Sequence, residues 1–68
     1  MKLDDIKYKR WYLLTDGGVA RCEGHHGSKP PAVKMLIVAP LTLGVRYLRP
    51  RDLERELDAA EIPEQFRD

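Results

Sequence analysis

The tetrapeptide TDGG at residues 15–18 constrains the fold of this chain more than any other feature of its sequence. Asp-Gly and Gly-Gly pairs readily adopt the positive φ angles of a tight turn between two antiparallel strands. Residues 6–14, before the turn, are rich in aromatic and branched side chains, and residues 19–23, after it, form a second, shorter run. The chain is therefore expected to begin with a β-hairpin.

Two further segments have the composition of strands. Residues 32–39, AVKMLIVA, form a nearly continuous apolar run of the length of one buried strand. Residues 45–49, VRYLR, alternate less regularly between apolar and basic side chains. Residues 24–31, GHHGSKPP, hold two glycines and two prolines and are expected to form a loop. Together these segments predict an antiparallel sheet of four or five strands within residues 6–49, with residues 32–39 as its central strand.

Residues 50–61 are expected to form a C-terminal helix that caps the sheet. Pro50 has a fixed φ angle that suits the first helical turn, where its missing N–H leaves no bond unmade. Three apolar residues recur at the i, i+4, i+7 spacing of one helix face: Leu53, Leu57 and Ala60. Pro63 stops the helix, and residues 62–68 form a tail that frays unless Phe66 docks.

The length and composition indicate one small folded domain over residues 1–68. The chain is 43% hydrophobic and 34% charged, which is apolar enough for collapse around one core. Cys22 is the only cysteine, so an internal disulfide is excluded and a reducing, cytoplasmic location is expected. The longest apolar run, residues 35–39, is too short to span a bilayer, and residues 1–10 lack the apolar stretch of a signal peptide. No membrane partner is therefore expected.

The formal net charge of +1 conceals two parts of opposite sign. Residues 1–51 carry ten Lys or Arg against four acids, and residues 52–68 carry seven acids against two Arg. This asymmetry indicates a basic binding surface beside an acidic segment, or two faces of one fold that attract each other. The alternative is that both are ordinary solvated surfaces.

Soft or borderline metal ligands cluster at one place, at Cys22, His25 and His26. The Cys-x-x-His spacing lets two side chains bind one tetrahedral ion, but a closed zinc site needs Glu23 or a second copy of the chain in a homodimer. The alternative is that Cys22 is a small buried residue and that both histidines lie in a solvated loop. A Cys–His nucleophile pair lacks an orienting group and a pocket, so we expect neither catalysis nor a cofactor.

Cations alternate with aromatic rings in two segments, residues 7–12 and residues 46–51. Cations release counterions from phosphates, and exposed rings stack on unpaired bases, so these segments are candidates for a nucleic-acid interface. The candidate residues are Lys7, Lys9, Arg10, Trp11, Arg46, Tyr47, Arg49 and Arg51. The alternative is that the tyrosines form the core and the cations are solvated charges at strand edges.

Three acids share one face of the expected helix: Glu54, Asp58 and Glu61. Such a face is often only solvated, but it also offers a docking surface to a basic patch on a larger protein. A protein-interaction module, such as an inhibitor or adaptor that binds by this face or by a free sheet edge, is therefore the alternative function.

The order and length of these elements resemble the small Src-homology-3-like (SH3-like) β-barrels. The resemblance covers residues 6–61 and includes the short strands, the hairpin turn, the Gly- and Pro-rich loop and the terminal helix. It implies a mainly β fold with one helix (α+β), either a small barrel or a bent antiparallel sheet capped by that helix. Members of this fold that bind nucleic acid do so with basic strands and loops, so the resemblance favours a non-enzymatic binding module, a nucleic-acid-associated regulatory protein. The size and composition are also similar to those of accessory proteins of bacteria and their phages, so a bacterial or phage type is expected.

Overall fold

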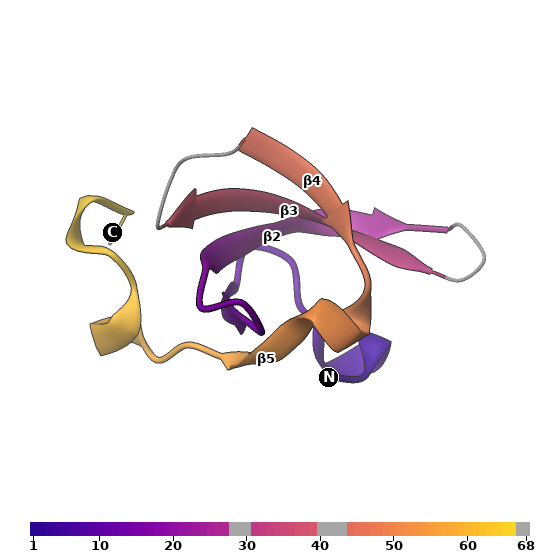
Figure 1. The fold of residues 1–68 in the computed structure, drawn as a ribbon, viewed down its shortest axis with the longest axis horizontal. Coiled ribbons are helices and arrows are strands. Elements are labelled where there is room, and N and C mark those ends of the chain that lie inside the picture. The colour runs from indigo at the N-terminus through magenta and orange to yellow at the C-terminus, as the bar shows by residue number, and fades with distance from the viewer. Residues whose placement is uncertain (28–30, 40–43, 67–68) are drawn as a thin grey trace.

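Five strands form one antiparallel sheet in the computed structural model, which describes residues 1–27, 31–39 and 44–66. The strands are β1 (Trp11–Leu14), β2 (Val19–His26), β3 (Ala32–Ala39), β4 (Gly44–Leu48) and β5 (Leu53–Glu56). Their order across the sheet is β4-β3-β2-β1-β5, so that β5 pairs with β1 and not with its sequence neighbour β4 (Figure 1). Short 3-10 turns complete the described chain: η1 (Leu3–Asp5), η2 (Pro50–Asp52), η3 (Ala59–Glu61) and η4 (Glu64–Phe66).

The turn at residues 15–18 joins β1 to β2 as predicted. The Gly17 N–H donates to the carbonyl oxygen of Leu14 at 3.0 Å, and the Leu14 N–H donates to Gly18 at 2.8 Å. The Asp16 carboxylate accepts a bond from the Gly18 N–H at 2.8 Å. Gly17 has a φ of 90°, a backbone conformation that residues with a side chain rarely adopt. The turn therefore requires glycine at this position.

The first strand is shorter than predicted, because residues 6–10 are not part of it. Lys9 has a positive φ of 65°, which turns the chain before β1 begins. The Lys9 N–H still donates to the carbonyl oxygen of Cys22 at 2.8 Å, and the Cys22 N–H donates to that of Arg10 at 2.9 Å. This segment is therefore held against β2 as an irregular extension of the hairpin.

The strands β3 and β4 lie at or close to the positions predicted from the sequence. β3 has the predicted bounds, and β4 lies one residue before its predicted position. β2 extends to His26 across a register shift between Cys22 and Gly24, so the predicted loop is shorter at its N-terminal side. β2, and not β3, is the middle strand of the five. Residues 28–30 of that loop, and residues 40–43 between β3 and β4, lie outside the described residues.

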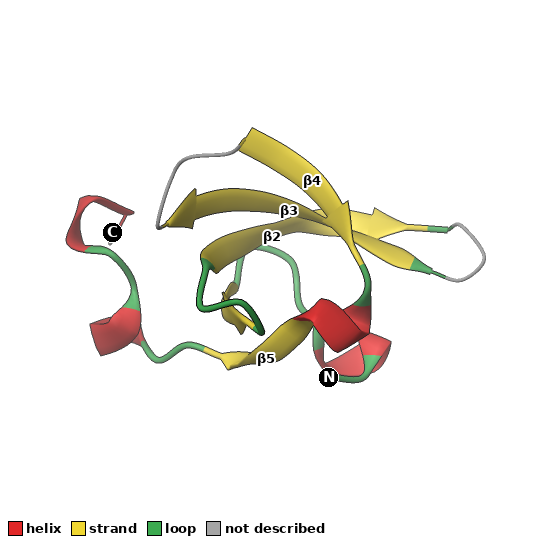
Figure 2. Cartoon of the chain, viewed as in Figure 1, coloured by secondary structure: helices red, strands yellow, loops and turns green. Residues whose placement is uncertain are grey.

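The predicted C-terminal helix over residues 50–61 is wrong. This segment forms η2, the strand β5 and η3, and no helix longer than a 3-10 turn occurs in the described part of the chain (Figure 2). β5 pairs with β1 at Leu14↔Leu53 and Tyr12↔Glu56. If residues 50–61 formed a helix, the N–H and C=O groups on the outer edge of β1 would have no strand partner. Pairing with β5 satisfies them, and the free energy gained by this pairing exceeds the small helix propensity of so short a segment.

The alternative of a closed barrel is also not realised. β4 and β5 are the two edges of the sheet. They are joined only through η2, and Figure 1 shows them separating from each other beyond this connection. The fold is therefore a bent, open antiparallel sheet without a capping helix.

Apolar side chains pack on both faces of this sheet. The inner cluster contains Ile6, Tyr12, Leu14, Ala20, Cys22, Val33, Met35, Ile37 and Leu53. The outer cluster contains Trp11, Val38 and Leu57, against which Leu13, Val19, Leu36, Ala39, Ile62 and Phe66 pack. Successive residues of β1 alternate between the two clusters, as the pleat of a strand requires. Leu53 and Leu57 also enter different clusters, although four residues separate them, because the register of β5 on β1 shifts between Leu13 and Leu14. Their i, i+4 spacing therefore does not mark one helix face.

Tyr12 connects the segment before β1 to the inner cluster. Its side chain is fully buried, and burial raises the pKa of its phenol. The Tyr12 hydroxyl accepts a bond from the Lys7 N–H at 2.7 Å and donates to the carbonyl oxygen of Asp5 at 3.4 Å. One phenol thus bonds to two backbone groups in the irregular segment that precedes β1.

We expect Tyr12→Phe to destabilise the fold by about 1–2 kcal/mol, because the Lys7 N–H loses its acceptor while the ring still fills the core. The free energy of unfolding is measured by urea denaturation. Tyr8→Phe is the matched control, since Tyr8 is 60% exposed and its substitution is expected to change stability little. Equal stability of Tyr12→Phe and the unsubstituted chain would contradict this role.

Candidate nucleic-acid interface

The strand order places opposite charges on opposite edges of the sheet. Residues 32–39 and 44–51, which contain β3, β4 and part of η2, carry four cations and no acid: Lys34, Arg46, Arg49 and Arg51. Residues 53–66, which contain β5, η3 and η4, carry five acids and one cation. Because β4 and β5 are the two edge strands, the asymmetry in the sequence becomes an asymmetry across the sheet.

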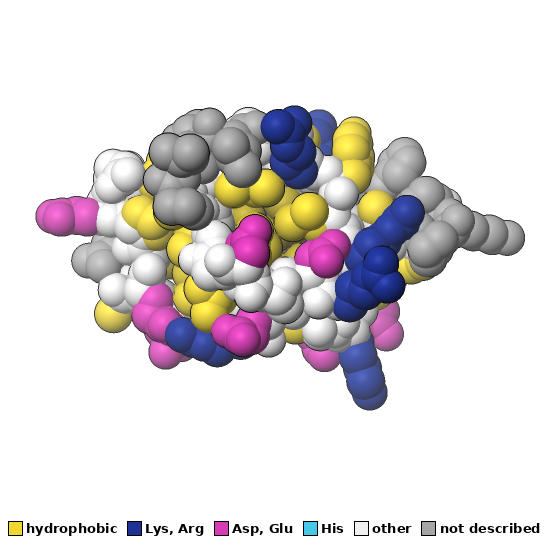
Figure 3. All heavy atoms as spheres, in the orientation of Figure 1, with side chains coloured by type: hydrophobic (Ala, Val, Ile, Leu, Met, Phe, Trp, Pro, Cys, Tyr) yellow, Lys and Arg dark blue, Asp and Glu magenta, His cyan; other side chains and the backbone are white. Residues whose placement is uncertain are grey.

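The predicted cations form two groups on different strands. Lys7, Lys9 and Arg10 precede β1, whereas Arg46, Arg49 and Arg51 lie on β4 and beside or within η2. The strands β2 and β3 lie between β1 and β4. On the face shown in Figure 3, Lys and Arg side chains also occur in separate places with acidic side chains between them. The group before β1 lies beside the acidic strand β5, because Tyr12 pairs with Glu56.

Trp11, predicted to stack on a base, belongs to the outer cluster. Its side chain is 6% exposed. The ring centroids of Trp11 and Phe66 are 5.3 Å apart with an interplanar angle of 43°, and the Arg21 guanidinium lies 5.7 Å from the indole centroid. These neighbours cover the ring, so Trp11 presents too little surface for stacking on a base.

Tyr47 has the exposed ring that base stacking requires. Its side chain is 60% exposed on the edge strand β4 and pairs across the sheet with Lys34. Val45, two residues before it on the same face, is 42% exposed and pairs with Leu36. We call the group formed by Lys34, Val45, Tyr47, Arg49 and Arg51, together with Arg46 on the other face of the same edge strand, the β4 patch. The sequence analysis missed Lys34, because only the register of β3 with β4 places it opposite Tyr47.

A cavity of about 340 Å³ extends the β4 patch toward η2. It is lined by Pro31, Arg49, Pro50 and Arg51. The backbone of this corner is fixed by Asp52, whose carboxylate accepts a bond from the Arg49 N–H at 2.9 Å. Two cations at one concave place on a fixed turn form a suitable environment for an anion such as phosphate.

The exposed ring of Tyr8 is a second feature that the sequence analysis missed. Tyr8 is 60% exposed, and the Lys9 ammonium lies 5.4 Å from its ring centroid. The alternation of cations and rings in residues 7–12 is a signal for Tyr8, although the candidate ring of that segment is Trp11. Tyr8 lies in the segment before β1, away from the cations of β4, so its ring does not add to the group around Tyr47.

The three acids predicted for protein docking do not share a helix face. Glu54 lies on β5, Asp58 precedes η3, and Glu61 lies within η3. The Glu61 carboxylate accepts bonds from the Arg55 guanidinium at 2.8 Å and from the Asp58 N–H at 3.0 Å. The Arg55 guanidinium lowers the pKa of Glu61 to about 2. Glu61 therefore closes a local turn and is not a free member of an acidic stripe.

We expect Glu61→Gln to destabilise the fold slightly at neutral pH, because Gln keeps an acceptor for the Asp58 N–H but loses the charge paired with Arg55. A carboxylate whose pKa is lower in the folded chain stabilises the fold above its unfolded pKa of about 4.3. That stabilisation is lost as the pH falls toward about 2. Chemical denaturation at several pH values should show the two proteins converging between about pH 5 and about pH 2.

Glu64→Gln, which changes an exposed acid on η4, is the control for that series. A difference between Glu61→Gln and the unsubstituted chain that persists unchanged at low pH would contradict the ion pair. High salt should reduce the difference at neutral pH, because exposed pairs are screened.

The candidate metal ligands are not brought together as an open site. Cys22 is fully buried in the inner cluster, and burial raises the pKa of its thiol. His25 is exposed, and its Nε2 donates to the carbonyl oxygen of Ile6 at 2.7 Å. The side chain of His26 lies outside the described structure. No group of three or more metal-ligating side chains occurs among the residues that are described. The environment of Cys22 agrees with the alternative of a small buried residue.

We expect the Cys22 thiol to react with iodoacetamide at least about tenfold more slowly in the folded protein than in urea, because burial disfavours the reactive thiolate. Mass spectrometry measures the modified fraction over time. Alkylation of the native protein at the rate seen in urea would show that Cys22 is accessible to solvent. Cys22 would then again be a candidate metal ligand.

Comparison with protein-family models, with curated proteins and with solved structures gives no significant match for this chain. None of the helical segments in residues 1–27, 31–39 and 44–66 has the length and apolar character needed to cross a membrane.

Proposed function

We propose that this protein is a non-enzymatic binding module that binds single-stranded nucleic acid through the β4 patch. The observation that carries the proposal is the exposed ring of Tyr47, which pairs across the sheet with Lys34 on two strands that carry no acid. Exposed rings stack on bases of any sequence, and nearby cations contact the phosphates.

Each part of the β4 patch has a role in this proposal. Tyr47 stacks on an unpaired base. Lys34, on the same face as Tyr47, contacts one flanking phosphate, and Arg46, on the other face of the edge strand, contacts a phosphate that lies at the edge itself. Arg49 and Arg51 hold a further phosphate at the cavity beside η2. The acidic residues on the opposite edge repel the polyanion and so favour one orientation of the module on a strand.

The fold supports a binding role in a more general way. Four strands follow one another as neighbours, the fifth pairs with the first, and a 3-10 turn joins the last two strands. This arrangement is compatible with an SH3-like module whose sheet is left open. Within the proposal, the protein is a small cytoplasmic regulator of bacterial or phage type that acts by occupying nucleic acid.

The proposal predicts that Tyr47→Ala weakens binding to a fluorescein-labelled oligo(dT) by about tenfold or more, because a stacked base contributes roughly 1–3 kcal/mol. Fluorescence anisotropy at low ionic strength measures the dissociation constant. Arg46→Gln should weaken binding and reduce the dependence of affinity on salt. Lys7→Gln is the matched control, since it removes a cation from the group before β1.

Two results would contradict the proposal. One is the absence of oligonucleotide binding at low ionic strength, where phosphate contacts are strongest. The other is an effect of Lys7→Gln as large as that of Arg46→Gln, which would place the interface before β1 or make it nonspecific.

A protein-interaction module is the second candidate, and the exposure of Val45 on an edge strand favours it. An extended segment of a partner protein would add to β4 and cover Val45 and Tyr47. In a pull-down from a nuclease-treated extract, Val45→Glu should then release specific protein bands that Glu64→Gln retains. Identical bands with both variants would count against this candidate.

A further inference from the structure

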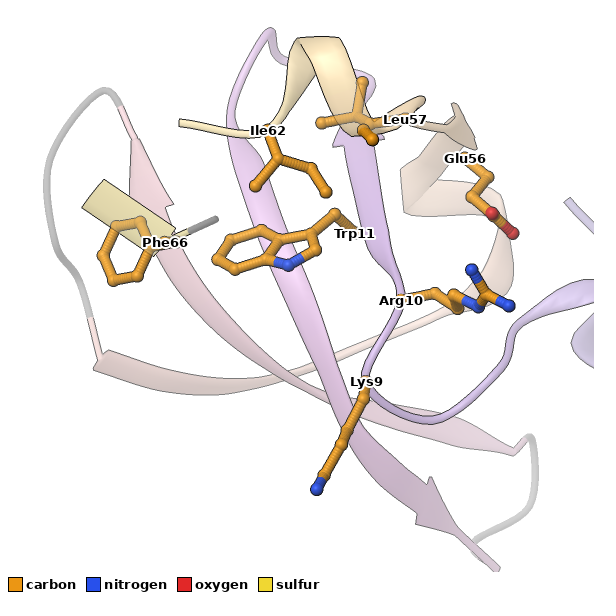
Figure 4. A pocket seen from close by; sticks show the side chains of 8 residues that line it. Lys9, Arg10, Trp11, Glu56, Leu57, Ile62 and Phe66 are labelled. Carbon is orange, nitrogen blue, oxygen red and sulfur yellow. The ribbon is translucent and has the colours of Figure 1, made fainter. Parts of the chain in front are cut away.

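A second concave site lies on the side of the sheet opposite to the β4 patch. It is a cavity of about 300 Å³ between the start of β1, the end of β5 and the C-terminal turns (Figure 4). Its lining residues are Lys9, Arg10, Trp11, Glu56, Leu57, Ala59, Ile62 and Phe66. Neither the nucleic-acid proposal nor the protein-docking alternative uses this cavity.

One wall of the cavity is apolar and aromatic. Trp11 and Leu57 belong to the outer cluster, and Ile62 and Phe66 pack against them from the C-terminal segment. In Figure 4 the indole of Trp11 lies between Phe66 on one side and the charged residues on the other. Ile62 and Phe66 are only partly buried, so apolar surface remains to be covered by a ligand.

The opposite end of the cavity is charged. Lys9 and Arg10 are exposed residues that line it, and Glu56 lines it beside them. Figure 4 shows the side chains of Arg10 and Glu56 extending toward each other. The local charge is therefore two cations against one carboxylate, which favours an anionic group but not a group of high negative charge.

We propose that this cavity binds a small amphipathic carboxylate, with its apolar body against Ile62, Phe66 and the small exposed part of Trp11, and its carboxylate at Arg10. A cavity of about 300 Å³ is at the small end of ligand sites, which limits the ligand to one ring or a short chain. A guanidinium binds a carboxylate with charge-assisted, often bidentate hydrogen bonds. Glu56 and the acids of η3 and η4 exclude nucleotides and other polyanions from this site.

The test uses three probes with the same apolar body and different head groups: 4-phenylbutyrate, 4-phenylbutan-1-ol and 4-phenylbutylamine. Trp11 is the only tryptophan of the chain and lines the cavity, so its fluorescence reports occupancy directly. We expect saturable changes whose affinities follow the order acid, alcohol, amine.

Charge variants at the rim distinguish the contact of the carboxylate with Arg10 from the contact of the apolar body with the wall. Arg10→Gln should weaken binding of the acid by about tenfold and leave the alcohol unchanged. Glu56→Gln should strengthen binding of the acid, because it removes the negative charge that lines the cavity beside Arg10. Arg51→Gln is the matched control, since Arg51 lies at the β4 patch: it should weaken oligonucleotide binding and leave the acid unaffected.

A variant that fills the cavity tests its location. Ala59→Phe should abolish the response to both acid and alcohol, and urea denaturation checks that the variant remains folded. The proposal is overturned if no probe gives a saturable response, if acid and amine bind equally, or if Arg10→Gln leaves the acid unchanged. It is also overturned if a folded Ala59→Phe variant still responds.

Discussion

The pairing of β1 on both of its edges is the interaction on which the rest of the structure depends. Trp11, Tyr12 and Leu13 of β1 pair with β2 on one side, and Tyr12, Leu13 and Leu14 pair with β5 on the other. Their side chains alternate between the inner cluster, through Tyr12, and the outer cluster, through Trp11. Without β5, the inner cluster would lose Leu53, and the outer cluster would lose the segment that brings Phe66 to Trp11.

This pairing also determines where the charges lie. The chain crosses from β4 through η2 to the far side of β1, so the acidic C-terminal segment follows one edge and the cationic β4 patch remains at the other. The two proposed sites differ accordingly. The β4 patch combines an exposed ring with several cations, whereas the cavity beside Trp11 combines a partly buried apolar wall with a rim that carries both signs of charge. Such a separation lets a very small domain bind two chemically different ligands.

The sequence predicted what is encoded locally. The turn at residues 15–18 depends on adjacent glycines, and β3 depends on a continuous apolar run, so both were found. The expected helix failed because Leu53 and Leu57 mark two clusters that exist only once β1 is in place. Similarly, the burial of Trp11 depends on Phe66, and the contribution of Lys34 depends on the register with Tyr47. These non-local contacts leave no periodic signal along the chain.

The pairing of β1 with β5 is tested most directly by nuclear Overhauser effects between backbone protons of the labelled protein. The account predicts cross-strand effects for the pairs Tyr12–Glu56 and Leu14–Leu53. It also predicts slow exchange of the Leu57 amide proton, which is bonded to the carbonyl oxygen of Trp11 at 2.8 Å. Continuous i to i+3 effects through residues 50–61, without contacts to β1, would show a helix in place of β5 and would contradict the account.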